Sequence, residues 1–331
     1  PVCLLGDIER GGVIASIVGT KTVMDERDAA MINGVAINKF RGDPSLFEDG
    51  VKSIEAMTGW PRYGVIPWLK ATARLPAEDA IAEVRARALG RNAVRIVAPM
   101  LSRMANFDDA DPLRLEPDVD FEFVPPGQPL PRDADLVILF GTKSTLGDLE
   151  FLRQQGWDHD IIAHARQGGR VLGSCGGYQR LGRRIVDESG ADGLAGDVPG
   201  LGLLDVEPRL TTGQAVRPVS GVCTARGTGI SGYEIHVGDT VGPACENPML
   251  NIESRAEGAM SRDGRIAGTY VHGCFSSDSY RQHYLSQLGA RPSGLEYDRH
   301  VDAALDELAA ELELTLDMDS LLSSARPPGR N

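Results

Sequence analysis

Apolar and polar positions alternate in two ways along the N-terminal part of the chain. Short apolar runs predict β-strands, and the stretches between them have the periodicity of amphipathic helices. The predicted strands lie near residues 2–6, 34–38 and 62–66, and the predicted helices near 11–24 and 45–58. Strands that alternate with helices in this way indicate βαβ units and a parallel sheet.

A second series of apolar runs begins after a connector at residues 70–91. Runs at 94–98, 136–140 and 171–173 predict buried parallel strands, with a helix near 149–167. Short strands with glycine-rich turns are expected from 200 to 271, followed by helices near 277–288 and 301–324. We therefore predict an α/β protein in three segments, which are residues 1–90, 91–290 and a C-terminal helical extension with a tail at 291–331.

The charge balance narrows the range of partners. The chain has 331 residues and a net charge of −13, and its lysines and arginines are scattered among acids, so no nucleic-acid-binding surface is expected. No stretch approaches the roughly 20 apolar residues of a membrane helix, and the N-terminal residues lack the pattern of a signal sequence. We expect a cytoplasmic protein that binds neither nucleic acid nor membrane.

One of the five cysteines stands in an unusual context. The five are widely spaced without a Cys-x-x-Cys pair, so neither a disulfide framework nor a zinc site is expected. Cys175, however, lies between an apolar strand and a helix start, and Gly173, Gly176 and Gly177 flank it. A nucleophile on so sharp a turn needs neighbours without a Cβ, and the following helix N-terminus favours a thiolate. Cys175 is the predicted nucleophile, and a buried cysteine that only packs is the alternative.

A cysteine nucleophile normally works with an imidazole that holds and relays its proton. His272 follows the strand-like run 266–271, which places it at the sheet edge where the active sites of open α/β folds lie. It is the predicted base, and a structural histidine is the alternative. His236, two residues after Glu234, is a rival base, but a structural or substrate-binding role is favoured for this pair.

Backbone N–H groups in glycine turns can stabilise the oxyanion of an acyl transfer. Gly176, directly after the nucleophile, is one candidate donor, and Gly141, in the loop after the 136–140 strand, is the other. In the N-terminal segment, Asp7 ends a strand, where a carboxylate can bind Mg²⁺ beside a phosphate or can simply cap a helix. No Gly-x-x-x-x-Gly-Lys-Ser/Thr loop is present, so these residues are not expected to form a complete phosphate site.

Several segments together resemble the cobyric acid synthase family of glutamine-hydrolysing amidotransferases. They are DIERGGV at 7–13, INKFRGD at 37–43, GVIP at 64–67, GTK at 141–143, GSCGGYQ at 173–179, GYEIH at 232–236 and GTYVHG at 268–273. The resemblance implies a partial dethiobiotin-synthetase-like ATP domain in residues 1–90. It implies that a class I glutamine amidotransferase domain, an open and mainly parallel sheet flanked by helices, follows in residues 91–290.

The resemblance also implies a reaction. ATP and Mg²⁺ would activate the b, d, e and g carboxylates of the corrinoid adenosylcobyrinic acid a,c-diamide, and ammonia from glutamine would convert each into an amide, giving cobyric acid. Cys175 would be the nucleophile and His272 the base. Asp7 would serve Mg²⁺ and phosphate, and Asn38 and Lys39 would lie near the nucleotide.

The sequence departs from the family pattern in three places. The phosphate loop of the family is expected upstream of Pro1. Cys274 stands two residues after His272, where the common class I enzymes have a glutamate, so a Cys–His pair is expected with its orienting group unassigned. Phe140 stands where many relatives have a proline before Gly141.

Three other interpretations are weighed against this one. A sister amidotransferase, such as cobyrinic acid a,c-diamide synthase or a cell-wall precursor amidase, is disfavoured by the segments at 7–12 and 38–43. A non-catalytic nucleotide-binding module is disfavoured by the intact Cys175 and His272. A stand-alone cysteine hydrolase is disfavoured by the fusion to a nucleotide-type domain.

Overall fold

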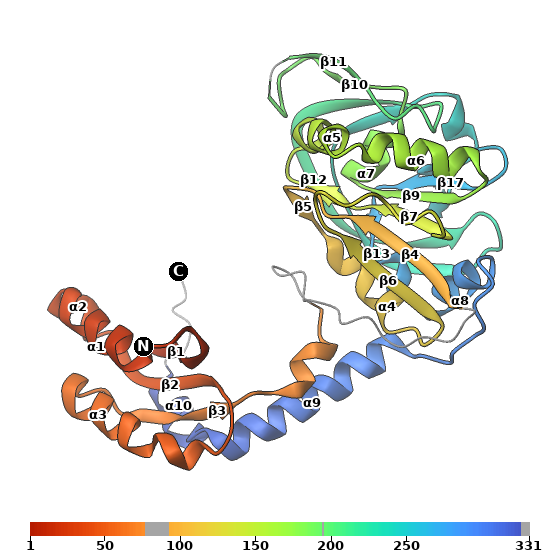
Figure 1. The fold of residues 1–331 in the computed structure, drawn as a ribbon. Coiled ribbons are helices and arrows are strands. Elements are labelled where there is room, and N and C mark those ends of the chain that lie inside the picture. The colour runs from red at the N-terminus through yellow and green to blue at the C-terminus, as the bar shows by residue number, and fades with distance from the viewer. Residues whose placement is uncertain (77–92, 194, 326–331) are drawn as a thin grey trace. The chain divides into compact units, whose positions relative to one another are not determined.

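The computed structural model describes residues 1–76, 93–193 and 195–325, which belong to two compact units (Figure 1). The first unit comprises residues 1–75 together with the C-terminal segment from residue 299 onward, and the second comprises residues 76–298. The predicted boundary near residue 91 lies outside the described residues. The C-terminal segment, expected from the sequence as an extension of its own, packs with the N-terminal residues.

The first unit is built on a parallel sheet with the strand order β1-β2-β3. Its strands are β1 (Val2–Asp7), β2 (Ile32–Phe40) and β3 (Arg62–Pro67). The connections contain α1 (Val13–Val23), α2 (Glu26–Ala29) and α3 (Glu48–Thr58), with short 3-10 turns at η1 (Ile8–Arg10), η2 (Pro44–Phe47) and η3 (Lys70–Arg74). Buried aliphatic residues of α1, β2 and α3, among them Ile17, Val35 and Ile54, form its core. The predicted βαβ alternation is confirmed.

Two helices complete the first unit where the sequence predicts one. They are α9 (Tyr297–Thr315) and α10 (Met318–Ser324), and the break between them lies at Asp317, whose side chain caps α10 by accepting from the N–H of Ser320. The N–H of Asp317 also donates to the carbonyl of Tyr63 over 2.7 Å, which ties the break to β3. Gly64 has a φ of 150°, and a Cβ there would lie 2.1 Å from the carbonyl oxygen of Thr315. Only glycine fits this contact.

The second unit contains a sheet of six strands in the order β16-β17-β9-β7-β4-β6. The bounds are β4 (Val94–Pro99), β6 (Val119–Val124), β7 (Leu136–Leu139), β9 (Arg170–Ser174), β16 (Ala259–Met260) and β17 (Ile266–Thr269). All neighbouring pairs are parallel except β16 with β17, so the predicted open and mainly parallel sheet is confirmed. Strand β6 was not expected from the sequence. Its alternating Val-Asp-Phe-Glu-Phe-Val pattern was a readable signal.

Helices cover one face of this sheet. They are α5 (Thr145–Gln154), α6 (Trp157–Arg166) and α7 (Gly176–Leu181). The single helix predicted near 149–167 is wrong, because Gly156 adopts a φ of 75° and separates α5 from α6. Val97, Val137 and Leu139 point into the core under these helices, whereas the alternate residues of the same strands face the other side.

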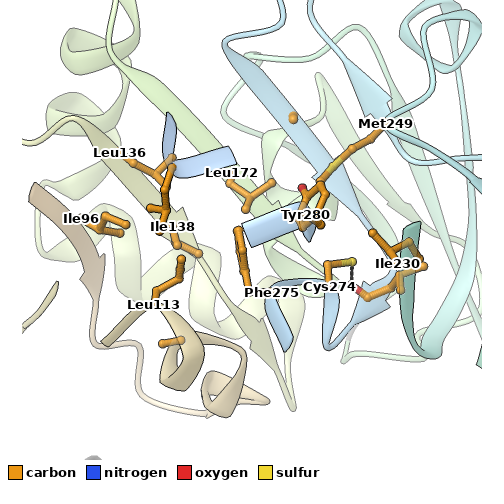
Figure 2. Packing of buried hydrophobic residues seen from close by; sticks show 14 of the residues in the cluster. Ile96, Leu113, Leu136, Ile138, Leu172, Ile230, Met249, Cys274, Phe275 and Tyr280 are labelled. Carbon is orange, nitrogen blue, oxygen red and sulfur yellow. Dashed lines mark hydrogen bonds between the residues drawn. The ribbon is translucent and has the colours of Figure 1, made fainter. Parts of the chain in front are cut away.

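A second, mainly antiparallel sheet packs on the face of the six-stranded sheet opposite α5, α6 and α7 and contributes to the hydrophobic core there. It contains β10 (Arg184–Asp187), β11 (Gly196–Pro199), β12 (Glu207–Cys223), β13 (Gly229–Val241), β14 (Leu250–Ile252), β15 (Arg255–Glu257) and β18 (Val271–His272). The expectation of only short strands between 200 and 271 is therefore wrong for the long β12–β13 pair. Figure 2 shows Ile138 and Leu172 of the parallel sheet in one cluster with Phe275 and Tyr280. Phe275 lies in the 3-10 turn η6 (Cys274–Ser276), and Tyr280 lies in the first turn of α8 (Asp278–Ser286).

Candidate active site

Cys175 lies at the tip of the turn between β9 and α7. Its backbone has φ 51° and ψ −114°, a strained conformation for a residue with a side chain. The turn closes only because Gly177 lacks a Cβ, which would otherwise lie 1.7 Å from the carbonyl oxygen of Leu139. The sulfur is partly accessible and lies 3.3 Å from the carbonyl oxygen of Ile235. The predicted strand-to-helix elbow is present in the structure.

His272 is brought to this elbow from β18, at the end of the chain segment that follows β17. It is completely buried, and its Nδ1 lies 2.7 Å from Oδ2 of Asp109. The other carboxylate oxygen of Asp109 accepts from the N–H of Gly273 over 2.7 Å. The carboxylate therefore binds both the His272 ring and the backbone of the next residue. The hydroxyl of Ser174 donates to the same carboxylate over 3.2 Å. Asp109 therefore fixes both the orientation and the tautomer of the ring.

The electrostatics of this group favour a protonated imidazole. Burial lowers the pKa of His272, but the carboxylate of Asp109 and the sulfur of Cys175 raise it more, to about 10. The buried Nε2 of the ring has no hydrogen-bond partner among the described residues, so it is the nitrogen left to exchange a proton with the sulfur. A protonated imidazole beside the sulfur is the acid–base partner that a cysteine nucleophile requires.

An aromatic ring packs on the imidazole. Tyr233 stacks on His272 with ring centroids 5.2 Å apart and an interplanar angle of 21°, as expected from their pairing between β13 and β18. The hydroxyl of Tyr233 accepts from the side-chain amide of Asn106 over 3.0 Å. Asn106 directly precedes η4 (Phe107–Ala110), the turn that carries Asp109. The same short segment thus supports the histidine from two sides.

The loop that contains Gly141 lies against the elbow. A Cβ on Gly141 would lie 3.5 Å from Cβ of Cys175, and a Cβ on Gly176 would lie 3.4 Å from the backbone nitrogen of Thr142. The two predicted oxyanion donors are thus neighbours of the nucleophile. The loop is held by the buried carboxylate of Asp148, which accepts from the Thr142 hydroxyl over 2.5 Å and from the backbone N–H of Arg103 over 3.2 Å.

Comparison with known proteins agrees with this geometry. Residues 95–280 match the model of the CobB/CobQ-like glutamine amidotransferase domain. The cobyric acid synthases of Hyphomonas neptunium and Paracoccus denitrificans are 58% and 56% identical to the chain over 99% and 98% of its length, and the match spans 67% of each relative. The solved structure of PurLQS from Thermotoga maritima is similar with a TM-score of 0.43 and 16% identity, covering 65% of this chain and 99% of that one, a level that bears on neither fold nor function.

The chain belongs to the cobyric acid synthase family. Membership confirms the prediction of a glutamine-hydrolysing amidotransferase of the ligase class that functions in cobalamin biosynthesis. The identity of the relatives also favours the predicted family over its sister amidotransferases. None of the described helices combines the length and the apolar character needed to cross a membrane.

The position that distinguishes this family member from the common class I pattern is Cys274. Its side chain is buried and its sulfur lies 3.6 Å from the carbonyl oxygen of Val271, within the cluster shown in Figure 2. Burial raises the pKa of this thiol far above its ordinary range. Cys274 is therefore a core residue, and the carboxylate beside His272 comes instead from Asp109, a residue that the sequence analysis did not single out.

Two other predicted site residues have a different setting. Glu234 is almost completely buried, and its carboxylate accepts from Arg217 over 2.8 Å and from Arg255 over 2.8 Å. Burial raises the pKa of Glu234, and the two guanidinium groups lower it more, so its net pKa lies below the ordinary value. Glu234 is thus engaged with arginines in the described structure. His236 lies in β13, and its side chain is outside the described part of the chain.

The three residues predicted near a nucleotide come together in the first unit. Asp7 and Asn38 are register partners at the carboxyl ends of β1 and β2. The ammonium group of Lys39 lies 2.8 Å from the carboxylate of Asp7, and the side-chain oxygen of Asn38 accepts from the N–H of Lys39 over 2.8 Å. Asp7 also caps η1 by accepting from the N–H of Glu9, so both alternatives considered for it are compatible with its position. No group of three or more His, Cys, Asp or Glu side chains suited to a metal ion is found among the described residues.

Proposed function

We propose that Cys175, His272 and Asp109 release ammonia from glutamine and that this ammonia is used to amidate a corrinoid in the formation of cobyric acid. The observation that carries the proposal is that Asp109 hydrogen-bonds to the buried ring of His272, close to Cys175, whose backbone has a strained conformation. A cysteine that only packs needs neither a strained backbone nor a histidine with a fixed tautomer. Membership of the family supplies the corrinoid context.

The reaction begins with attack by the Cys175 thiolate on the side-chain amide carbon of glutamine. Negative charge develops on the amide oxygen, and the backbone N–H groups of Gly176 and of the Gly141 loop would stabilise it, a role that the closeness of Gly141 to Cys175 supports. The imidazolium of His272 donates its proton to the amide nitrogen, and ammonia leaves. A γ-glutamyl thioester on Cys175 results.

Hydrolysis of the thioester restores the site. His272, now neutral, accepts a proton from water as the oxygen attacks the thioester carbon, and glutamate leaves with regeneration of the thiolate–imidazolium pair. Asp109 does not exchange a proton in this sequence. It acts as a positioning residue, because its carboxylate stabilises the imidazolium and orients Nε2 toward the sulfur.

The ammonia acceptor would be activated by ATP and Mg²⁺, as the family resemblance implies. Mg²⁺ usually binds one or two protein carboxylates together with phosphate oxygens, and Asp7 beside Lys39 fits such a shared site. Asp7 would hold the ion, Lys39 would neutralise phosphate charge, and Asn38 would lie near the nucleotide. The activated groups would be the b, d, e and g carboxylates of adenosylcobyrinic acid a,c-diamide.

Two measurements test the proposal. The purified protein should release glutamate and ammonia from glutamine, and Cys175→Ser should abolish this release while keeping the circular dichroism spectrum. With ATP, Mg²⁺, glutamine and adenosylcobyrinic acid a,c-diamide, mass spectrometry should detect a product with four hydroxyl groups exchanged for amines. Glutamine hydrolysis at the wild-type rate in the serine variant would refute the assignment of Cys175. An unchanged mass of the a,c-diamide, with two amidations when cobyrinic acid is supplied in its place, would identify a sister enzyme.

A further inference from the structure

We propose that Glu257 is a positioning residue that holds the end of β17 and, through it, both Cys175 and His272. The proposal rests on the proposed function, because it concerns the geometry of the same site. Glu257 ends β15, is 3% exposed, and touches neither catalytic side chain. Its two carboxylate oxygens both bind the segment that leads into His272.

The contacts of Glu257 are short and directional. One oxygen accepts from the backbone N–H of Tyr270 over 2.7 Å, and the other accepts from the hydroxyl of Thr269 over 2.5 Å. Strand β17 ends at Thr269, so its neighbouring strands do not continue to pair with the chain beyond it. Without the carboxylate, the buried Thr269 hydroxyl and Tyr270 N–H would lose these acceptors. An unsatisfied buried donor is costly, which gives this carboxylate a strong hold on the backbone.

The held segment leads to both catalytic residues. The carbonyl of Thr269 accepts from the backbone N–H of Cys175 over 2.9 Å, and Thr269 is the register partner of Ser174. The hydroxyl oxygen of Thr269 accepts from the N–H of Val271 over 3.0 Å, which shapes the turn directly before His272. A displacement of Thr269 would therefore shift the sulfur and the imidazole relative to each other.

Glu257 also lies in a buried environment in which an ionised carboxylate costs free energy. Burial raises its pKa to about 7, although the hydrogen bonds from Thr269 and Tyr270 lower it. It lines a cavity of about 180 Å³, and the titratable or charged groups that face it there are Glu234 of β13, Arg255 of its own strand, Asp239 of β13, Tyr178 of α7, Cys245 of η5 (Pro243–Glu246) and Tyr270. An ionisable group is thus retained beneath the site at an energetic cost that an amide or an apolar residue would avoid.

Protonation of Glu257 should weaken the hold. The protonated carboxyl has one oxygen that donates, so it cannot accept from both the Thr269 hydroxyl and the Tyr270 N–H in the observed arrangement. We therefore expect the turnover number of the wild type to fall as the pH drops through about 7. This fall is the acid limb of the plot of kcat against pH. A group that only stabilised the fold would change the melting temperature without producing an acid limb near pH 7.

The test is Glu257→Gln, which keeps the shape of the side chain but removes one acceptor. We expect kcat for glutamine hydrolysis to fall about 10- to 100-fold, KM to change less than about threefold, and the acid limb near pH 7 to disappear. The rate at which iodoacetamide alkylates Cys175 should fall as well. Thr269→Val keeps the carboxylate but removes the contacts of the Thr269 hydroxyl with Glu257 and with the N–H of Val271. It should lower kcat as well and serves if the first variant does not fold.

A matched control is Glu116→Gln. Glu116 is also buried, and it accepts from Arg281 over 2.7 Å and from Gln282 over 2.9 Å, contacts that do not include the end of β17. This variant should lose thermal stability but retain its kcat and the acid limb. An unchanged kcat and pH profile in Glu257→Gln, or an equal loss of kcat in Glu116→Gln, would overturn the proposal. If the wild type does not hydrolyse glutamine, the proposed function fails, and the alkylation rates still decide the role of Glu257.

Discussion

In both units the proposed functional residues lie at the same kind of place in the sheet, but their surroundings differ. In each, side chains follow the carboxyl ends of neighbouring parallel strands, Asp7 and Asn38 in the first unit and Cys175 in the second. The histidine of the second unit is completely buried and is held by a carboxylate and an aromatic ring. By contrast, the side chains of Asp7 and Lys39 are 26% and 44% exposed.

The difference in burial suits each site to a different kind of chemistry. Covalent catalysis needs a nucleophile and an acid–base group fixed within hydrogen-bond reach, and burial with directional contacts provides that. Binding a phosphate and a metal ion requires charges that remain accessible to a ligand, because the ligand supplies much of the coordination. The proposed catalytic residues of the second unit are therefore already held in place, whereas the proposed nucleotide site of the first unit leaves its charged side chains accessible to a ligand.

The largest effect should come from the nucleophile. Cys175→Ala should lower glutamine hydrolysis by at least about 10⁴-fold, because no neighbouring group can form the thioester. The release of glutamate is measured with the wild type in parallel. The melting temperature should stay close to that of the wild type, because the 3.3 Å contact of the thiol with the Ile235 carbonyl is weak. Residual activity above a hundredth of the wild-type rate would contradict the covalent route.

The next effect should come from the positioning carboxylate. Asp109→Asn should lower kcat by about 10²- to 10³-fold, because the amide can neither stabilise the imidazolium nor hold the neutral ring in one tautomer. Asp108→Asn is the matched control, an adjacent acid that makes no hydrogen bond to His272 in the described structure. Steady-state kinetics on both variants would separate loss of the contact from loss of one negative charge. Equal losses in the two variants would argue against a specific role for Asp109.

A third effect concerns stability and pH. The folded-state pKa of His272, about 10, lies above its ordinary value of 6.5, so its contribution to stability is fully present below about pH 6.5 and is lost as the pH rises through about 10. The unfolding free energies of the wild type and of His272→Asn should thus converge with rising pH, from a difference of at most roughly 5 kcal/mol. Denaturation monitored by the fluorescence of the buried Trp157 measures this. A difference that does not depend on pH would show that the imidazole is not charged in the folded protein.

The smallest effect on glutamine hydrolysis is expected from the first unit. Asp7→Asn should change glutaminase activity by less than about twofold, because the side chain of Asp7 is partly exposed and takes no part in the proposed hydrolysis of glutamine. The same variant should lose amidation that depends on ATP and Mg²⁺. Asp25→Asn, which alters another capping carboxylate of this unit, should retain both activities. An equal loss of glutaminase activity in Asp7→Asn would mean that the Asp7 site and the Cys175 site do not function independently.

The sequence analysis was most successful where structure is determined locally. The strands near 2–6, 62–66, 94–98 and 171–173 follow from short apolar runs, and the elbow at Cys175 follows from glycines that the turn itself requires. It failed where one residue changes the path of the backbone. Gly156 divides the predicted helix at 149–167, and Asp317 divides the one at 301–324.

By itself, the sequence determined the parallel α/β architecture, the strand-to-helix turn at Cys175 and the family, because apolar periodicity and a glycine-flanked turn act over a few residues. Only the tertiary structure decided what surrounds the nucleophile. Asp109 lies 163 residues before His272 in the chain, and Glu257 reaches Thr269 from another strand. No local pattern marks such partners, because the order in which strands pair in space brings them together.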